Sequence, residues 1–152
     1  MRIIPLAATA AALAACTTET PAADTTDSYA MLLEADADRA AKDVPAAWTD
    51  FTGAAFAEAQ AEGRTVIVDV YADWCPTCKA QAPILDELAE EEALDDALLL
   101  KVDYDRDKDF VRALRIPRQS TVLRFENGEE VQRSVAETDP MRLRDVVLGD
   151  AA

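Results

Sequence analysis

The feature that most constrains the fold is a pair of cysteines, Cys75 and Cys78, that follows a long apolar run. Residues 65–71 read Thr-Val-Ile-Val-Asp-Val-Tyr, and this nearly continuous apolar run is typical of a central strand covered on both faces. The residues that follow favour a helix over about residues 75–91, with a kink at Pro83. A covered strand that leads directly into a helix predicts an α/β domain.

The placement of the two cysteines indicates redox chemistry. Cys75 would stand at the N-terminus of the helix, where free N–H groups and the helix dipole favour a thiolate. Cys78 lies three residues further on, close enough to close a disulfide with Cys75. We expect the Cys75 thiol to be exposed and acidic, and the Cys78 thiol to be more buried and to resolve the mixed disulfide.

Two other uses of the pair fit the sequence less well. A zinc site would need a second pair of ligands, but the chain has no histidine and no second Cys-x-x-Cys segment. A purely structural disulfide that closes so short a loop would add little stability. The sequence therefore favours a redox pair and no metal site.

Composition excludes several further classes. Acidic residues outnumber basic ones 30 to 15, so the formal charge is −15, and such a surface repels phosphate backbones. We therefore expect no nucleic-acid partner. The absence of histidine removes Ser-His and Cys-His catalysis. Asp103, Asp105, Asp107 and Asp109 alternate as in a calcium loop, but Lys108 occupies the position of its glycine, so we expect solvated loop acids.

The rest of the chain predicts helices and strands in the order α-β-α-β-α-β-β-α, which is typical of a mixed sheet. Thr52 is a candidate N-cap, Gly63 a helix stop, and Asn127-Gly128 the turn of a β-hairpin. The acidic segment 86–96 is expected to form a solvated helical face. The expected helices cover residues 52–62, 75–91, 110–114 and 139–149, and the expected strands cover 65–71, 98–104, 121–125 and 129–134.

The N-terminal segment resembles the leader of a bacterial lipoprotein. Arg2 precedes an uncharged apolar run over residues 3–15, which is short for a membrane span and is typical of a signal peptide. The run ends in Leu13-Ala14-Ala15-Cys16, which is similar to the lipobox of that class, in which the cysteine becomes the acylated first residue. An ordinary secretory leader is the alternative, and either would export the chain to an oxidising compartment.

These observations predict three segments. Residues 1–15 form a lipoprotein signal peptide, residues 16–47 a lipidated tether with a possible helical spacer, and residues 48–152 the folded domain. Lipid on Cys16 would anchor the protein to the bacterial cell envelope on its periplasmic side. The sequence leaves open whether the anchor lies in the inner or the outer membrane.

From residue 48 to residue 149 the chain resembles the thioredoxin family. Residues 68–79 read Val-Asp-Val-Tyr-Ala-Asp-Trp-Cys-Pro-Thr-Cys-Lys, which is similar to the family's active-site stretch, with the buried aspartate at Asp69. The lysine that pairs with that aspartate, the kink proline and the last hairpin match at Lys101, Pro83 and residues 126–129. The resemblance implies a thioredoxin fold, with a central mixed β-sheet flanked by helices on both faces.

The resemblance also implies a monomeric thiol:disulfide oxidoreductase that acts on protein disulfides and needs no cofactor beyond its Cys75–Cys78 disulfide. Asp69 would accept the Cys78 proton, directly or through water; the alternative is a buried acid satisfied by Lys101 alone. Net reduction of substrate disulfides is expected, because the Asp69–Lys101 pair and Trp74 match reducing thioredoxins. The expected substrate contacts are Trp74, Pro76, Thr77, Gln119, Ser120 and Thr121.

Ser120 departs from the family pattern, because it occupies the position of the family's cis-proline, and Pro117 lies three residues too early to replace it. A cis bond before a non-proline residue costs ~2.5–4 kcal/mol, so we expect a trans bond and a reshaped substrate edge. We also expect a Ser120→Pro variant to be accommodated. Ala136 stands where the family usually has a glycine, which argues against ordinary thioredoxin specificity.

Residues 118–121, next to Trp-Cys-Pro-Thr-Cys, are similar to a subgroup of exported bacterial thioredoxin-like proteins. This likeness suggests that a CcdA/DsbD-type membrane transporter supplies the electrons. Two alternatives stay open. The Cys-Pro-Thr-Cys motif resembles that of cytochrome c maturation thioredoxins, which makes apocytochrome a second candidate substrate. Without a shielding proline, the two thiolates would alternatively hold an iron–sulfur cluster or a soft metal across a dimer interface.

Overall fold

The computed structural model describes residues 47–149. The signal peptide predicted over residues 1–15, the predicted lipidation site Cys16 and residues 16–46 of the predicted tether and spacer lie outside the described residues. The strands are β1 (Thr49–Asp50), β2 (Val66–Tyr71), β3 (Leu98–Asp103), β4 (Thr121–Glu126) and β5 (Glu129–Val135). The α-helices are α2 (Gly53–Ala61), α3 (Pro76–Leu88), α4 (Lys108–Ala113) and α5 (Pro140–Leu148), and a short 3₁₀ helix, η2, covers Glu92–Leu94.

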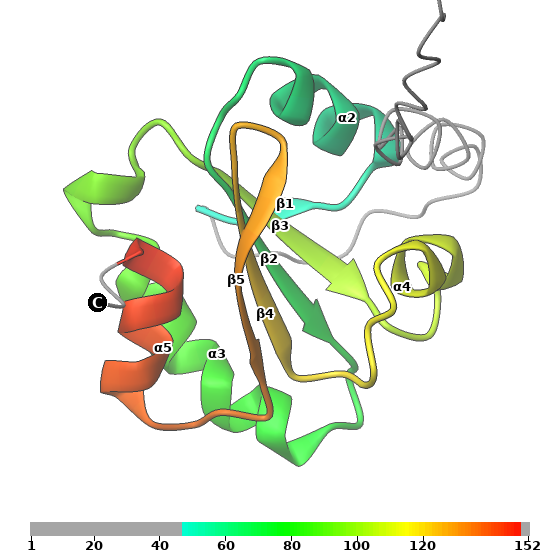
Figure 1. Cartoon of the computed structure of the whole chain (residues 1–152). Coiled ribbons are helices and arrows are strands. Elements are labelled where there is room, and N and C mark those ends of the chain that lie inside the picture. The colour runs from blue at the N-terminus through cyan, green and yellow to red at the C-terminus, as the bar shows by residue number, and fades with distance from the viewer. Residues whose placement is uncertain (1–46, 150–152) are drawn as a thin grey trace, which may run out of the picture.

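The strands form one mixed five-stranded sheet in the order β1-β3-β2-β4-β5, with β2 at its centre (Figure 1). β1, β3 and β2 are parallel, whereas β4 is antiparallel to both β2 and β5. The register sets Asp69 of β2 beside Lys101 of β3, and Val70 of β2 beside Thr121 of β4. The order of strands thus brings the start of β4 next to the end of β2, where the cysteine segment begins.

Helices cover both faces of the sheet, as the sequence predicts (Figure 1). Successive side chains of a strand point to opposite faces. Val68 and Val70 of β2 accordingly pack in one apolar cluster with Phe56 of α2, to which α4 also contributes. Ile67 packs in a second cluster with Leu143 of α5 and with residues of α3. Among residues 47–149, no helix combines the length and the apolar character that a membrane span requires.

The predicted helix ends and turn are confirmed. The Thr52 hydroxyl accepts a hydrogen bond from the Ala55 N–H (3.1 Å) and caps α2. At the other end of the chain, the Asp139 carboxylate caps α5, and Pro140 takes its first position. The hairpin between β4 and β5 turns at Asn127-Gly128, where both residues have positive φ, as a type I′ turn requires.

The acidic segment 86–96 differs from the prediction. α3 ends at Leu88, and the chain turns before η2 begins, so a single helical face over the whole segment is wrong. The reason lies in packing, because Leu94 is buried in the same apolar cluster as Leu88 and draws the chain back toward the sheet. The two-residue strand β1 was not predicted either, because so short a pairing with β3 leaves no periodic pattern.

Candidate active site

Cys75 stands where the chain leaves the central strand and enters α3, and it forms the N-cap of that helix. Its N–H donates to the Ala72 carbonyl (3.0 Å), and its Sγ accepts a hydrogen bond from the Cys78 N–H (3.2 Å). Pro76 takes the first helical position, where a backbone N–H has no partner within the helix. Both cysteines carry free thiols.

A second loop, which ends at the start of β4, brings Ser120 against both sulfurs. The Ser120 Oγ lies 3.1 Å from the Cys75 Sγ and 3.0 Å from the Cys78 Sγ. The Ser120 N–H donates to the Val70 carbonyl (2.7 Å), and the Ser120 carbonyl accepts from the Ala136 N–H (2.7 Å). No peptide bond within residues 47–149 is cis, which confirms the trans bond predicted before Ser120.

Both sulfurs are buried, which corrects one expectation from the sequence. Cys75 is 1% exposed and Cys78 is 7% exposed, so the prediction of an exposed first thiol is wrong in this state. Ser120, which is fully buried, lies against both Sγ atoms, and Ala72 packs with the two cysteines. Trp74 beside the pair is 61% exposed and Pro76 is exposed, so these two residues form the accessible rim of the site.

The two thiols have pKa values that shift in opposite directions. Burial raises the pKa of Cys75, but hydrogen bonds from Cys78, Ser120 and Gln119 outweigh it and lower that pKa to about 7. Burial also raises the pKa of Cys78, and its hydrogen bond to Cys75 raises it further. The first thiol is therefore partly ionised at neutral pH while the second keeps its proton. This difference agrees with Cys75 as the attacking thiol and Cys78 as the resolving thiol.

Asp69 and Lys101 form a buried ion pair beneath the site. The Asp69 Oδ2 and the Lys101 Nζ lie 2.6 Å apart, and both residues are buried. Burial raises the pKa of Asp69, and the charge of Lys101 opposes that rise without cancelling it. The Asp69 Oδ1 is buried and has no hydrogen-bond partner among residues 47–149. In the described part of the chain, Asp69 makes no hydrogen bond to Cys78, so a proton-transfer role for Asp69 stays a prediction.

The cap, the dithiol and the pair beneath it match one family. The sequence model of the Thioredoxin family covers residues 48–148. The chain belongs to the thioredoxin family.

Individual relatives agree with this assignment. Thioredoxin-1 of Saccharomyces cerevisiae is 31% identical over 100 residues, which are 66% of this chain and 94% of that protein. The bifunctional thioredoxin reductase/thioredoxin of Mycobacterium leprae is 33% identical over 80 residues, or 53% of this chain, and this chain covers only 17% of its length. The crystal structure of Trxlp from Edwardsiella tarda EIB202 superposes with a TM-score of 0.64 at 43% identity, over 66% of this chain and 97% of that one.

As a thioredoxin, the protein is a thiol:disulfide oxidoreductase that acts on protein disulfides. In the reductive direction, the predicted order of attack begins at Cys75, whose thiolate attacks a substrate disulfide and forms a mixed disulfide while one substrate thiolate leaves. Cys78 then attacks the Cys75 Sγ, the second substrate thiol leaves, and the Cys75–Cys78 disulfide forms. The substrate gains two electrons and the dithiol loses two, so the exchange balances.

The structure corrects the expected behaviour of a proline at position 120. Ser120 has φ +62°, whereas proline is restricted to φ near −65°. A proline would also remove the N–H that donates to the buried Val70 carbonyl. A proline at position 120 is therefore incompatible with this backbone unless the loop moves. The prediction that Ser120→Pro is accommodated is wrong for this backbone.

The residues predicted to contact the substrate differ in accessibility. Trp74 and Pro76 are exposed, Thr77 and Gln119 are half-buried, and Ser120 and Thr121 are fully buried. The Thr121 hydroxyl donates to the Arg118 carbonyl (2.7 Å) and holds the loop that carries Ser120. The role of this set in substrate binding stays a prediction.

Trp74 is held by the acidic loop after β3. Its indole N–H donates to the Asp105 Oδ2 at 2.7 Å. The Asp103 carboxylate accepts from backbone N–H groups of the same loop, those of Asp105 and Arg106. Within residues 47–149, no three or more Cys, Asp or Glu side chains are placed to hold a metal ion. Of the other alternating aspartates, Asp107 accepts from the Asp103 N–H and Asp109 pairs with Arg112.

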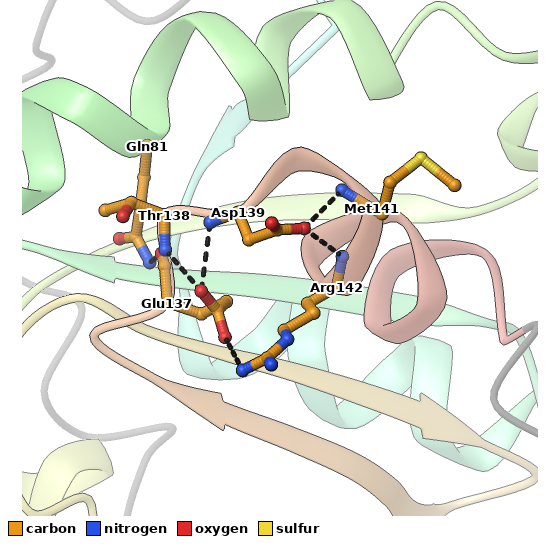
Figure 2. Close-up of polar contacts among 6 residues, drawn as sticks. All are labelled: Gln81, Glu137, Thr138, Asp139, Met141 and Arg142. Atoms are coloured by element: carbon orange, nitrogen blue, oxygen red, sulfur yellow. Dashed lines mark hydrogen bonds and ion pairs between the residues drawn. The ribbon is translucent and has the colours of Figure 1, made fainter.

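A further contact, which the sequence did not reveal, ties α3 to the loop before α5. Gln81, one turn after Cys78, is fully buried, and its Nε2 donates to the Glu137 carbonyl at 2.6 Å (Figure 2). The Glu137 carboxylate in turn accepts from the N–H groups of Thr138 and Asp139, which lowers the pKa of Glu137. The signal for Gln81 was its spacing, since it lies on the same buried stripe as Cys78 and Leu85.

Proposed function

We propose that this thioredoxin is a membrane-anchored, periplasm-facing reductase of protein disulfides. The observation that carries the direction of electron flow is the modest stabilisation of the thiolate. Hydrogen bonds lower the pKa of Cys75 only to about 7, and the pKa of Cys78 is raised. A strong dithiol oxidant owes its oxidising power to a strongly stabilised reduced form. A weakly stabilised dithiol gives up its electrons more readily, which favours reduction of substrates.

The proposed location rests on the N-terminal segment. The apolar run over residues 3–15 and the lipobox-like Leu13-Ala14-Ala15-Cys16 support export and a lipid anchor. The periplasm is oxidising, so a reductase there has to receive electrons from across the membrane. A CcdA/DsbD-type transporter would deliver them to the Cys75–Cys78 disulfide, which is the only redox group that the proposal requires.

The anchor is tested by membrane fractionation of the full chain and its Cys16→Ala variant. The variant is expected to leave the membrane fraction and to keep its disulfide reductase activity, because the anchor is a lipid outside the folded domain. A Cys78→Ala variant, which keeps Cys16, is the matched control and stays in the membrane fraction. If Cys16→Ala remains with the membranes after a high-salt wash, the lipid anchor is wrong.

The electron source is tested by the redox state of the pair in cells. Acid trapping followed by alkylation of free thiols separates the dithiol from the disulfide. We expect mostly dithiol in cells that contain the CcdA/DsbD-type transporter and mostly disulfide in cells that lack it. A pair that is mainly disulfide in both strains would contradict a reducing role.

A narrower substrate is the second candidate. The Cys75-Pro76-Thr77-Cys78 motif, which resembles that of cytochrome c maturation thioredoxins, favours apocytochrome. A Cys78→Ser variant traps substrates as mixed disulfides on Cys75, and apocytochromes among the trapped proteins would select this function. The iron–sulfur or soft-metal alternative has less support, because both sulfurs are buried against Ser120. Visible absorbance of the freshly purified protein would support the iron–sulfur or soft-metal alternative.

A further inference from the structure

Ser120 offers the two sulfurs a single hydroxyl proton. Its Oγ lies within 3.1 Å of both Sγ atoms, and either partner of each contact is able to donate. A serine hydroxyl donates one hydrogen bond and accepts up to two. At any moment Ser120 therefore donates to only one of Cys75 and Cys78.

We infer that Ser120 is a catalytic residue whose hydroxyl donates first to the Cys75 thiolate and then, after rotating about its Cβ–Oγ bond, to the Cys78 thiolate. Hydrogen bonds to ionised groups are about twice as strong as neutral ones, so the hydroxyl follows the negative charge. The inference rests on the thiol–disulfide exchange at these two cysteines and is independent of the membrane anchor and of the electron donor.

The backbone of Ser120 is fixed so that only the hydroxyl is free to turn. Its N–H and its carbonyl are both engaged, with the Val70 carbonyl and the Ala136 N–H. The residue is 0% exposed, so water does not compete for the two sulfurs through this side. No other side-chain hydroxyl or carboxylate of residues 47–149 hydrogen-bonds to either sulfur, since the carboxylate beneath them, Asp69, bonds to Lys101 instead.

Each step of the exchange balances. The Cys75 thiolate, with Ser120 as its donor, forms a bond to one substrate sulfur while the substrate S–S bond breaks and its other sulfur leaves as a thiolate. That thiolate takes the Cys78 proton, by way of Asp69 if Asp69 serves as the base, and the Ser120 hydroxyl turns to donate to the new Cys78 thiolate. Cys78 then bonds to the Cys75 Sγ, and the second substrate thiolate leaves. The products are the protein disulfide, one substrate thiol and one substrate thiolate, with two electrons moved to the substrate.

The test follows both bond exchanges in one experiment. Full-length reduced protein, with Cys16→Ala in every variant so that no third thiol reacts, is mixed with excess glutathione disulfide. Samples are quenched in acid, alkylated and analysed by mass spectrometry, which separates the dithiol, the mixed disulfide with glutathione and the protein disulfide. The time courses give one rate constant for attack by Cys75 and one for attack by Cys78, measured from pH 6 to pH 9.5.

Ser120→Ala removes the hydroxyl and keeps the Cβ atom. At pH 7 we expect both rate constants to fall by about tenfold, as the loss of a hydrogen bond to a charged group predicts. The deficit should shrink toward high pH, where both thiols ionise without help. Ser120→Gly also lacks the hydroxyl and tolerates a positive φ, so it gives the same test if the alanine variant folds poorly. Ser134→Ala in β5 is the matched control and should leave both rate constants unchanged.

Three results would overturn the inference: a fall in the first rate constant alone, unchanged rate constants, or an equal fall at every pH. The first would limit Ser120 to Cys75, and the third would indicate a purely structural role. A wild-type protein that forms neither the mixed nor the internal disulfide would instead contradict the exchange chemistry itself, independently of Ser120.

Discussion

Two loops meet at the same sulfurs, and they are held by different means. The loop that carries Cys75 has ordinary backbone angles, with φ −83° at the N-cap, and its shape follows from the cap and from Pro76. The loop that carries Ser120 contains two left-handed non-glycine residues, Arg115 at φ +50° and Ser120 at φ +62°, and it contacts a third, Ala136 at φ +57°.

The difference shows what each loop contributes. Non-glycine residues in left-handed conformations cost roughly 1 kcal/mol or more each, so they persist only where the surrounding structure holds them. Here the hydrogen bonds that link Val70, Ser120 and Ala136 stabilise the left-handed conformations of Ser120 and Ala136. The cysteine loop is therefore encoded locally and supplies the reacting groups, whereas the serine loop depends on the assembled sheet and sets the environment of the sulfurs.

The largest expected effect concerns the cysteine loop. Cys75→Ser should reduce disulfide reductase activity to the uncatalysed background, because it removes the attacking sulfur. Cys78→Ser should instead accumulate mixed disulfides on Cys75, visible as thiol-sensitive adducts on a non-reducing gel. Equal trapping by both variants would contradict the order of attack.

Ser120→Pro tests the serine loop most severely. The substitution leaves the buried Val70 carbonyl without its donor, which costs about 1–3 kcal/mol, and it also forces φ away from +62°. We expect the midpoint of urea unfolding to fall clearly, whereas Ser120→Gly, which suits a positive φ, should not lower it. A proline variant as stable as the wild type would show that this loop adopts another path with ease.

The raised pKa of Asp69, which lies in β2 beside Lys101, predicts how the stability of the protein changes with pH. A carboxyl group whose folded pKa lies above its unfolded value of 3.8 adds stability at low pH, and this stability is lost as the pH rises through the folded pKa. The stability of Asp69→Asn relative to the wild type should therefore increase as the pH rises above the unfolded pKa of 3.8. Glu137→Gln is the matched control with the opposite sign, because the pKa of Glu137 is lowered.

Asp69→Asn also tests the predicted proton transfer. If Asp69 accepts the Cys78 proton through water, the variant should slow resolution of the mixed disulfide more than the first attack. The difference should be on the order of tenfold, below the roughly 100-fold minimum typical of general base catalysis, because other bases can replace a carboxylate. Quenched-flow measurement of both steps gives the ratio. Unchanged rates in both steps would leave Asp69 as the partner of Lys101 alone.

The smallest expected effect concerns Ala136. Glycine adopts φ +57° without strain, so Ala136→Gly should raise the free energy of unfolding by about 0.5–1 kcal/mol. Chemical denaturation at pH 7 measures the change. Ala80→Gly, at an exposed position inside α3, is a matched control in which the same substitution should destabilise the protein. Loss of stability at position 136 would mean that packing of the methyl group outweighs the backbone strain.

The sequence predicted most of the fold because its signals are local. The caps at Thr52 and Asp139, the Asn127-Gly128 turn and the apolar run before Cys75 each act within a few residues. Helix α3 was predicted too long, because burial of Leu94 in the core is a tertiary effect that no local pattern reports.

The sequence predicted the reacting groups of the site but not the residues that surround them. Cys75 and Cys78 were predicted from their spacing after an apolar strand, whereas the Asp69–Lys101 pair was implied by the resemblance to the thioredoxin family. The burial of Cys75 and the hydroxyl between the sulfurs depend on the loop of Ser120, whose left-handed residues are not glycines and so leave no signal in the sequence. The buried Gln81 depends on a different contact, with Glu137, 56 residues away.

The reduction potential of the Cys75–Cys78 pair tests the central claim most directly. Equilibration of the full chain with a defined dithiol–disulfide buffer, followed by alkylation of free thiols, gives the fraction reduced at each potential. A protein that reduces substrates should have a potential near the thioredoxin value of about −270 mV. A potential near about −120 mV, the value of the oxidant DsbA, would contradict a reductase and reverse the proposed direction of electron flow.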